Sequence, residues 1–190
     1  MIDLPQHDYN QFNGSSGLAT VKWGPHAWVF LFASIHGAYP VKLNNKNKEH
    51  LEIRKHFKQL FTSLQYTMPC VFCRNSYKIF FKELPIDKFL TGRIELMHWL
   101  YLLRDKVNQK LIEQEKECYN TEKKILKKKY HDNKITKEEY YSSVEKFKNM
   151  TFKTQSSPPF IEVLEKFETM RAACSQKSKT CTLPINNTKE

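Results

Sequence analysis

The sequence predicts an all-α protein whose helices are joined by short polar connectors. Only five glycines occur in 190 residues, which argues against a loop-rich sheet protein. Long stretches rich in Lys, Glu and Leu favour helices, and apolar residues recur at helical rather than alternating spacing. No stretch carries a strand signal of any strength.

Length and composition predict one main domain with room for an appendage. The formal charge of +11 raises the question of a nucleic-acid or membrane-surface partner. The lysines are interleaved with glutamates along predicted helices instead of forming a basic patch with aromatic residues, so we expect no nucleic-acid partner. Five cysteines are too few for a disulfide-scaffolded secreted module, and the polar N-terminus shows no signal peptide. The longest apolar run, Ala27–Ala33, is too short to span a bilayer, so we expect an intracellular protein without membrane insertion.

The first two predicted helices carry the residues of a core. Residues 1–19 are polar and are predicted to be a flexible N-terminal tail. The first helix runs from about Val21 to Tyr39 and ends at Pro40, and we expect nearly all of it to be buried. Its two tryptophans are more typical of a core than of a cofactor site. The second helix, at about 48–65, has one apolar stripe: Ile53, Phe57, Leu60, Phe61 and Leu64.

A Cys-x-x-Cys pair opens the third predicted helix. Cys70 and Cys73 follow Pro69, and because proline is favoured at the first helical position we expect the helix to begin there and to stop before Pro85. Residues three apart share a helix face, so the two thiols can form a disulfide or bind one partner. The positive end of the helix favours thiolates. Spacing alone leaves a redox pair and half of a zinc site equally open, although a βαβ framework and a second closely spaced ligand pair are both missing.

The fourth predicted helix has a mixed inner face. After a connector at Pro85–Gly92 it starts near Arg93, and its stripe combines apolar residues with Arg104 and Asn108. Buried polar groups need hydrogen-bonding partners. A polar ligand or nearby carboxylates of the same chain would satisfy them, and the pattern leaves both open.

The remaining chain divides into an insertion, a last helix and a tail. Residues 113–154 are predicted to be a lysine-rich helical insertion, a solvated hairpin with its turn near residues 131–134 and a capping box at Thr136–Glu139. The main domain is then 20–112 with 155–175, and 176–190 is a polar C-terminal tail. The last helix carries one stripe: Phe160, Val163, Leu164, Phe167 and Met170.

Three blocks in order, over residues 23–111, resemble the ALR/Erv family of FAD-linked sulfhydryl oxidases. Trp23–Leu31 with Tyr39-Pro40 resembles the family's W-G-x-x-x-W-x-x-L-H…Y-P helix, Met68–Cys73 its P-C-x-x-C, and Trp99–Leu111 its W-L-x-x-x-H-N-x-V-N-x-x-L. The ending, Val163–Cys174, resembles the versions encoded by large DNA viruses. The chain departs from the pattern where Phe32 replaces a histidine and Arg104-Asp105 replaces His-Asn.

The resemblance implies a four-helix bundle with a short fifth helix, FAD in its mouth, and no metal. It implies an enzyme that makes disulfides in protein dithiols and passes the electrons through Cys70 and Cys73 to FAD and then to O₂, giving H₂O₂. Cys70 is expected to be the outer sulfur that substrate attacks, and Cys73 the sulfur beside the flavin. The implied cofactor-binding residues are Gly24, Trp28, Leu31, Phe32, Tyr39, Tyr101, Arg104, Asp105, Val107, Asn108, Lys110, Leu111 and Phe167.

The resemblance also implies a homodimer, and a setting in a virus factory or virion, or in the mitochondrial intermembrane space if the chain is cellular. Cys174 and Cys181 flank a short polar loop and are candidates for a shuttle disulfide. A structural staple of the last helix and a Cys118–Cys174 link are the competing interpretations. The alternative function is a non-enzymatic helical binding module with a structural or zinc-bound Cys-x-x-Cys and a basic arm.

Overall fold

The computed structural model describes residues 17–172, which form two compact units. The first unit holds the described residues up to Tyr101 together with those from Phe160 onward, and the second is Leu102–Pro159. Within the described part all regular structure is helical, and β-pairing is limited to two isolated bridges. The predicted all-α class is confirmed. None of the described helices is long and apolar enough to cross a membrane.

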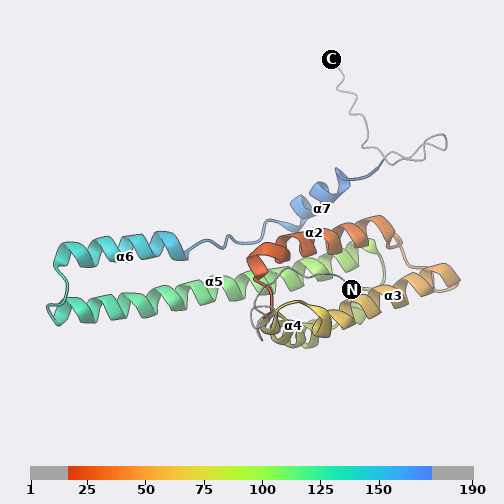
Figure 1. The fold of residues 1–190 in the computed structure, drawn as a ribbon. Coiled ribbons are helices and arrows are strands. Elements are labelled where there is room, and N and C mark those ends of the chain that lie inside the picture. The colour runs from red at the N-terminus through yellow and green to blue at the C-terminus, as the bar shows by residue number, and fades with distance from the viewer. Residues whose placement is uncertain (1–16, 173–190) are drawn as a thin grey trace, which may run out of the picture. The chain divides into compact units, whose positions relative to one another are not determined.

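The first unit is built from four helices and a short fifth. They are α2 (Thr20–Ala38), α3 (Lys48–Thr67), α4 (Val71–Glu83), the first turns of α5 (Arg93–His131), and α7 (Phe160–Glu168), as Figure 1 shows. A 3₁₀ turn, η1 (Ile86–Phe89), lies in the predicted connector. The Asn47 side chain accepts the N–H groups of Glu49 and His50 and so fixes the start of α3.

The core of the first unit is aromatic. Trp99 of α5 is fully buried, lies edge-on to Phe61 of α3 with ring centroids 4.7 Å apart, and donates from Nε1 to the Leu84 carbonyl at 2.9 Å. Phe32 of α2 and Phe167 of α7 are stacked at 5.3 Å. Aromatic pairs of this kind contribute about 0.5–1.5 kcal/mol beyond their buried area. These contacts join α3 to α5 and α2 to α7, and Tyr39 at the end of α2 lies edge-on to Phe57 of α3 at 5.3 Å.

A charged network ties α7 to α2 beyond that ring stack. His36 is buried, and its Nε2 lies 2.7 Å from Glu168 Oε2. Arg171 donates from Nε to Glu168 Oε1 at 2.6 Å and from Nη2 to Oε2 at 2.8 Å. Glu168 therefore links an imidazole on α2 to a guanidinium just past α7.

Three expectations about the first unit need correction. The first helix is not nearly all buried, because Val21 is 78% exposed and Phe30 63%. Helix α4 begins at Val71 and not at Pro69, because Cys70 keeps an extended backbone (φ −130°, ψ 126°) and serves as the N-cap. Residues 17–19 are not part of a tail, since Gly17 pairs with Cys70 in one of the two bridges.

The second unit is a helical hairpin. Helix α5 continues to His131, and α6 (Lys137–Thr151) follows a turn in which Asn133 adopts a φ of 56°, a conformation that asparagine tolerates. The predicted capping box is present, with Thr136 Oγ1 accepting the Glu139 N–H and the Glu139 carboxylate accepting the Thr136 N–H.

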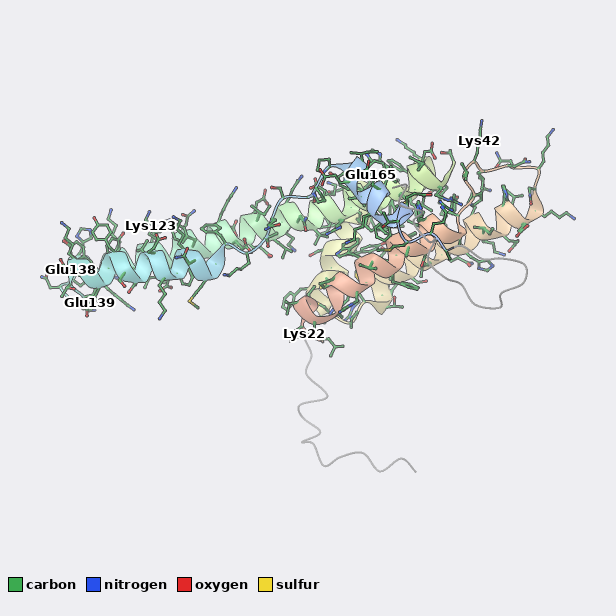
Figure 2. The ribbon with its side chains drawn as sticks, turned by 90° about the horizontal axis from the view of Figure 1, so that it is seen from above. Lys22, Lys42, Lys123, Glu138, Glu139 and Glu165 are labelled. Atoms are coloured by element: carbon green, nitrogen blue, oxygen red, sulfur yellow. The ribbon has the colours of Figure 1, made fainter. Side chains whose placement is uncertain are left out.

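At the other end of this hairpin, the Glu115 carboxylate accepts both the backbone N–H and the hydroxyl of Thr154, at 3.0 and 2.7 Å. No residue of α6 is buried, and charged side chains such as Lys123 and Glu138 project outward from the two helices (Figure 2). The hairpin is therefore held by the Glu115–Thr154 hydrogen bonds and by the ring contacts Tyr119–Phe152 and Tyr130–Tyr140.

Candidate active site

The two cysteines lie at the start of α4, where Cys70 is the N-cap residue and Cys73 lies in the first turn. Cys70 is the N-cap, and its Sγ accepts the backbone N–H of Cys73 at 3.2 Å. The free N–H groups at a helix N-terminus and the positive end of its dipole stabilise negative charge. Both sulfurs are thiols in the structure. The arrangement places a potential thiolate where backbone donors already point.

The N-terminal segment lies on the backbone of the same site. The Leu18 N–H donates to the Pro69 carbonyl at 2.7 Å, beside the Gly17–Cys70 bridge. Gly17 has a φ of +78°, and a Cβ at this position would lie 2.0 Å from the Pro69 oxygen. Only glycine allows the chain to pass there.

A threonine completes the surroundings of the second sulfur. Thr20 is the first residue of α2, and its Oγ1 lies 3.2 Å from Cys73 Sγ. The sequence analysis missed this residue. It is 53 positions away from Cys73 and belongs to no recognisable motif, so only the folded chain brings the two together.

The surroundings shift the pKa values of the two thiols in opposite directions. Burial alone would raise the pKa of Cys70, but hydrogen bonds from Cys73 and Thr20 to its sulfur outweigh burial and lower it. Burial raises the pKa of Cys73, and the neighbouring Cys70 adds to that, while the Thr20 hydroxyl acts in the opposite direction. The surroundings therefore favour a thiolate at Cys70 over one at Cys73.

Exposure does not follow the expected order of the sulfurs. Cys70 was expected to be the outer sulfur, yet it is 7% exposed, whereas Cys73 is half-buried. Residues 17 and 18 pair with the backbone at Pro69 and Cys70, on the side of the first sulfur.

The predicted cofactor residues of α2 fall into two groups. Gly24 is buried and Trp28 half-buried, at successive turns beyond Thr20. Leu31 and Phe32 are buried in the core. Tyr39 is fully buried and its hydroxyl donates to the Leu90 carbonyl at 2.9 Å, which makes it a core residue in this structure. Because α2 has 19 residues, Tyr39 lies about 28 Å along the helix from the cysteine end.

The predicted cofactor residues near α7 are also largely occupied by packing. Phe167 is 3% exposed and stacks on Phe32. Tyr101 is half-buried, with its ring 5.4 Å from that of Phe160. Both assignments to a cofactor remain predictions.

The predicted cofactor residues of the second unit lie on α5. Asn108 donates to the Ser157 hydroxyl at 2.9 Å, so its partner is neither a ligand nor a carboxylate. Asp105 accepts a hydrogen bond from Gln109. The half-buried Arg104 guanidinium makes no hydrogen bond or ion pair with any described residue. The other positions named from the sequence are Val107 and Lys110, both half-buried, and Leu111, which is exposed.

The chain has three further cysteines. Cys118 is an exposed free thiol on α5. Cys174 and Cys181 lie outside residues 17–172, so their pairing stays a prediction.

A hollow of about 960 Å³ lies along α3 and is lined by basic side chains, among them Lys42, Arg54, Lys55 and Lys58. Neither cysteine lines it, and neither does any predicted cofactor residue. Two of its lysines are already paired, Lys55 with Glu52 and Lys58 with Asp87. We assign it no part in the thiol chemistry.

Comparison with known proteins places the chain in a family. Residues 25–131, more than half of the chain, match the model of the Erv1/Alr family. No curated protein matches. Among solved structures, the chain is similar to the yeast Erv1 core, at 19% sequence identity and a TM-score of 0.42, over 58% of this chain and 82% of that one. On the strength of the family match, the chain belongs to the Erv1/Alr family, whose members bind FAD and are typically sulfhydryl oxidases.

Proposed function

We propose that this chain is an FAD-dependent sulfhydryl oxidase that makes disulfide bonds in protein dithiols, with O₂ as the final electron acceptor. The observation that carries the proposal is the Cys70–Cys73 pair at the start of α4, inside the span that matches the family. Two thiols this close interconvert with a disulfide without moving the backbone far.

The residues present fit a flavin nucleotide. Gly24 lies one turn beyond Thr20, which contacts Cys73, and Trp28 lies one turn further. Each turn advances about 5.4 Å, so α2 offers a position without a side chain one turn from Thr20 and a half-buried aromatic surface about two turns from it. The half-buried guanidinium of Arg104, in the second unit, has no hydrogen-bond or ion-pair partner among residues 17–172, and a guanidinium is suited to a phosphate. On the family resemblance, we assign Gly24 and Trp28 of the first unit to the flavin.

The chain's own residues carry the thiol exchange. A substrate thiolate attacks Cys70 Sγ of the Cys70–Cys73 disulfide, forming a mixed disulfide and expelling Cys73 as a thiolate. The second substrate thiolate then attacks the substrate sulfur, releasing the oxidised product and expelling Cys70. A thiol of lower pKa is the better leaving group, so the lowered pKa of Cys70 favours this release.

When bound, FAD accepts the two electrons of the reduced Cys70–Cys73 pair and passes them to O₂, which takes up two protons to give H₂O₂. The protein holds Cys73 half-buried and in contact with Thr20.

Residues 17–172 contain no group of three or more His, Cys, Asp or Glu side chains arranged to hold a metal ion. A structural zinc site uses four such ligands.

A visible absorption spectrum tests the proposal. Purified protein should be yellow, and heat should release FAD. Colourless protein that releases zinc on thiol modification would contradict the oxidase.

Cysteine variants test the roles of the two sulfurs. Cys70→Ser and Cys73→Ser should each abolish thiol-dependent oxygen consumption while FAD stays bound, and Cys118→Ser, which changes an exposed thiol on α5, should not. Cys70→Ser should show a long-wavelength charge-transfer shoulder that Cys73→Ser lacks. The reverse pattern would mean that the two roles are exchanged.

A further inference from the structure

Two helix N-termini meet at the cysteine pair. Helix α4 is capped by Cys70 Sγ, which accepts the Cys73 N–H. Helix α2 has Ala19 as its N-cap, a residue that offers no side-chain acceptor. The first side chain of α2, Thr20, lies with its hydroxyl 3.2 Å from Cys73 Sγ. The sulfur of Cys73 thus faces a hydroxyl from a different helix, at hydrogen-bonding distance.

Backbone contacts just before Thr20 hold the start of α2 against the cysteine segment. Just before α2, Leu18 donates its N–H to the Pro69 carbonyl, and its own carbonyl accepts Nε1 of Trp23 at 3.3 Å. Gly17 pairs with Cys70 in a conformation that needs glycine. The start of α2 is therefore attached to the residues immediately before Cys73, and this attachment fixes Thr20 relative to the sulfur.

We propose that Thr20 is a positioning residue for the dithiol, whose hydroxyl donates a hydrogen bond to Cys73 whenever that sulfur is a thiolate. In the thiol form either partner can donate. A thiolate has no proton, so in that form the hydroxyl must be the donor, and the contact then stabilises the negative charge. Hydrogen bonds to charged groups are the stronger ones.

The inference rests on the proposed function for its place in the reaction. When substrate attacks Cys70, the Cys70–Cys73 bond breaks and its electron pair goes to Cys73 Sγ. The Thr20 O–H meets that developing charge, offsetting the burial that disfavours it. Without the hydroxyl, expulsion of Cys73 becomes slower and the reduced pair holds less thiolate at this position.

The test is a titration of Cys73 that needs neither flavin nor oxygen. Full-length protein carrying Cys70→Ser has one active-site thiol, and serine keeps an N-cap acceptor at position 70. The rate at which iodoacetamide alkylates Cys73 is followed against pH, with the modified peptide identified by mass spectrometry. In this background Thr20→Val, which removes the hydroxyl and keeps the branched shape, should raise the Cys73 pKa by roughly one unit. Alkylation below that pKa should slow about tenfold.

Conservative and control variants separate this role from a structural one. Thr20→Ser should restore the alkylation rate to within about twofold, because it returns the donor. Thr62→Val, which removes the hydroxyl of an exposed threonine on α3, should change nothing. If circular dichroism shows that Thr20→Val is not folded, Thr20→Ala takes its place with the same expectation.

An unchanged Cys73 titration in Thr20→Val, or a serine variant that titrates like valine, would overturn the inference. Colourless protein with the expected titration would instead contradict only the oxidase.

Discussion

Replacing Phe32 by histidine tests whether this side chain belongs to the core or to a ligand site. The family resemblance expects a histidine at this position and a flavin beside it. In the structure Phe32 is fully buried and stacks on Phe167, with ring centroids 5.3 Å apart. The substitution Phe32→His therefore places an imidazole where the structure shows an aromatic neighbour.

The expected cost follows from two terms. Loss of the aromatic pair removes about 0.5–1.5 kcal/mol. An imidazole N–H buried without a partner adds about 1–3 kcal/mol. We expect Phe32→His to destabilise the protein by about 2–4 kcal/mol. With a urea m-value of about 2 kcal/mol per M, the midpoint of unfolding falls by roughly 1–2 M.

Urea unfolding followed by circular dichroism, with FAD content measured on the same samples, is the assay. Phe30→His is the matched control, because Phe30 lies two residues away on α2 and is 63% exposed. It should stay within about 0.5 kcal/mol of the parent. A midpoint for Phe32→His that equals or exceeds that of the parent, with FAD retained, would show that position 32 faces a ligand and would refute this reasoning.

Three further predictions concern the network of His36, Glu168 and Arg171, the exposed face of α2, and Cys174 with Cys181. Hydrogen bonds from Arg171 hold the pKa of Glu168 at about 2, below its ordinary 4.5. The contribution of Glu168 to folding stability is therefore present above pH 4.5 and is lost as the pH falls toward 2. In Glu168→Gln the urea midpoint should depend less on pH in that range, whereas Glu165→Gln should keep the pH dependence of the parent. We expect a homodimer that uses the exposed face of α2, where Phe30 is 63% exposed. Phe30→Asp should therefore sediment as a monomer. A parent chain that is already monomeric and active at micromolar concentration would contradict the dimer. If Cys174 and Cys181 form a shuttle, the double serine variant should oxidise dithiothreitol normally but fail on a reduced protein, whereas a joint loss of both activities and of thermal stability identifies a staple.

Much of the helical framework could be predicted from the sequence, because the signals there are local. Helical spacing of apolar residues locates α3 and α7, prolines mark the ends of α2 and α4, and the Thr136–Glu139 capping box starts α6. The Cys-x-x-Cys pair was also visible, since its spacing lies within one helical turn. Each of these signals involves residues only a few positions apart in the sequence, so it can be recognised without the tertiary structure.

Tertiary structure alone decided what surrounds the two sulfurs. Thr20 reaches Cys73 across 53 positions, and Gly17 pairs with Cys70, contacts that no local pattern records. Cys70 pairs with an extended backbone, α4 starts at Val71, and the sulfur that the sequence analysis placed outermost is buried. The residue types set which groups can ionise. Their order of exposure and ionisation depends on partners that only folding brings within hydrogen-bonding distance.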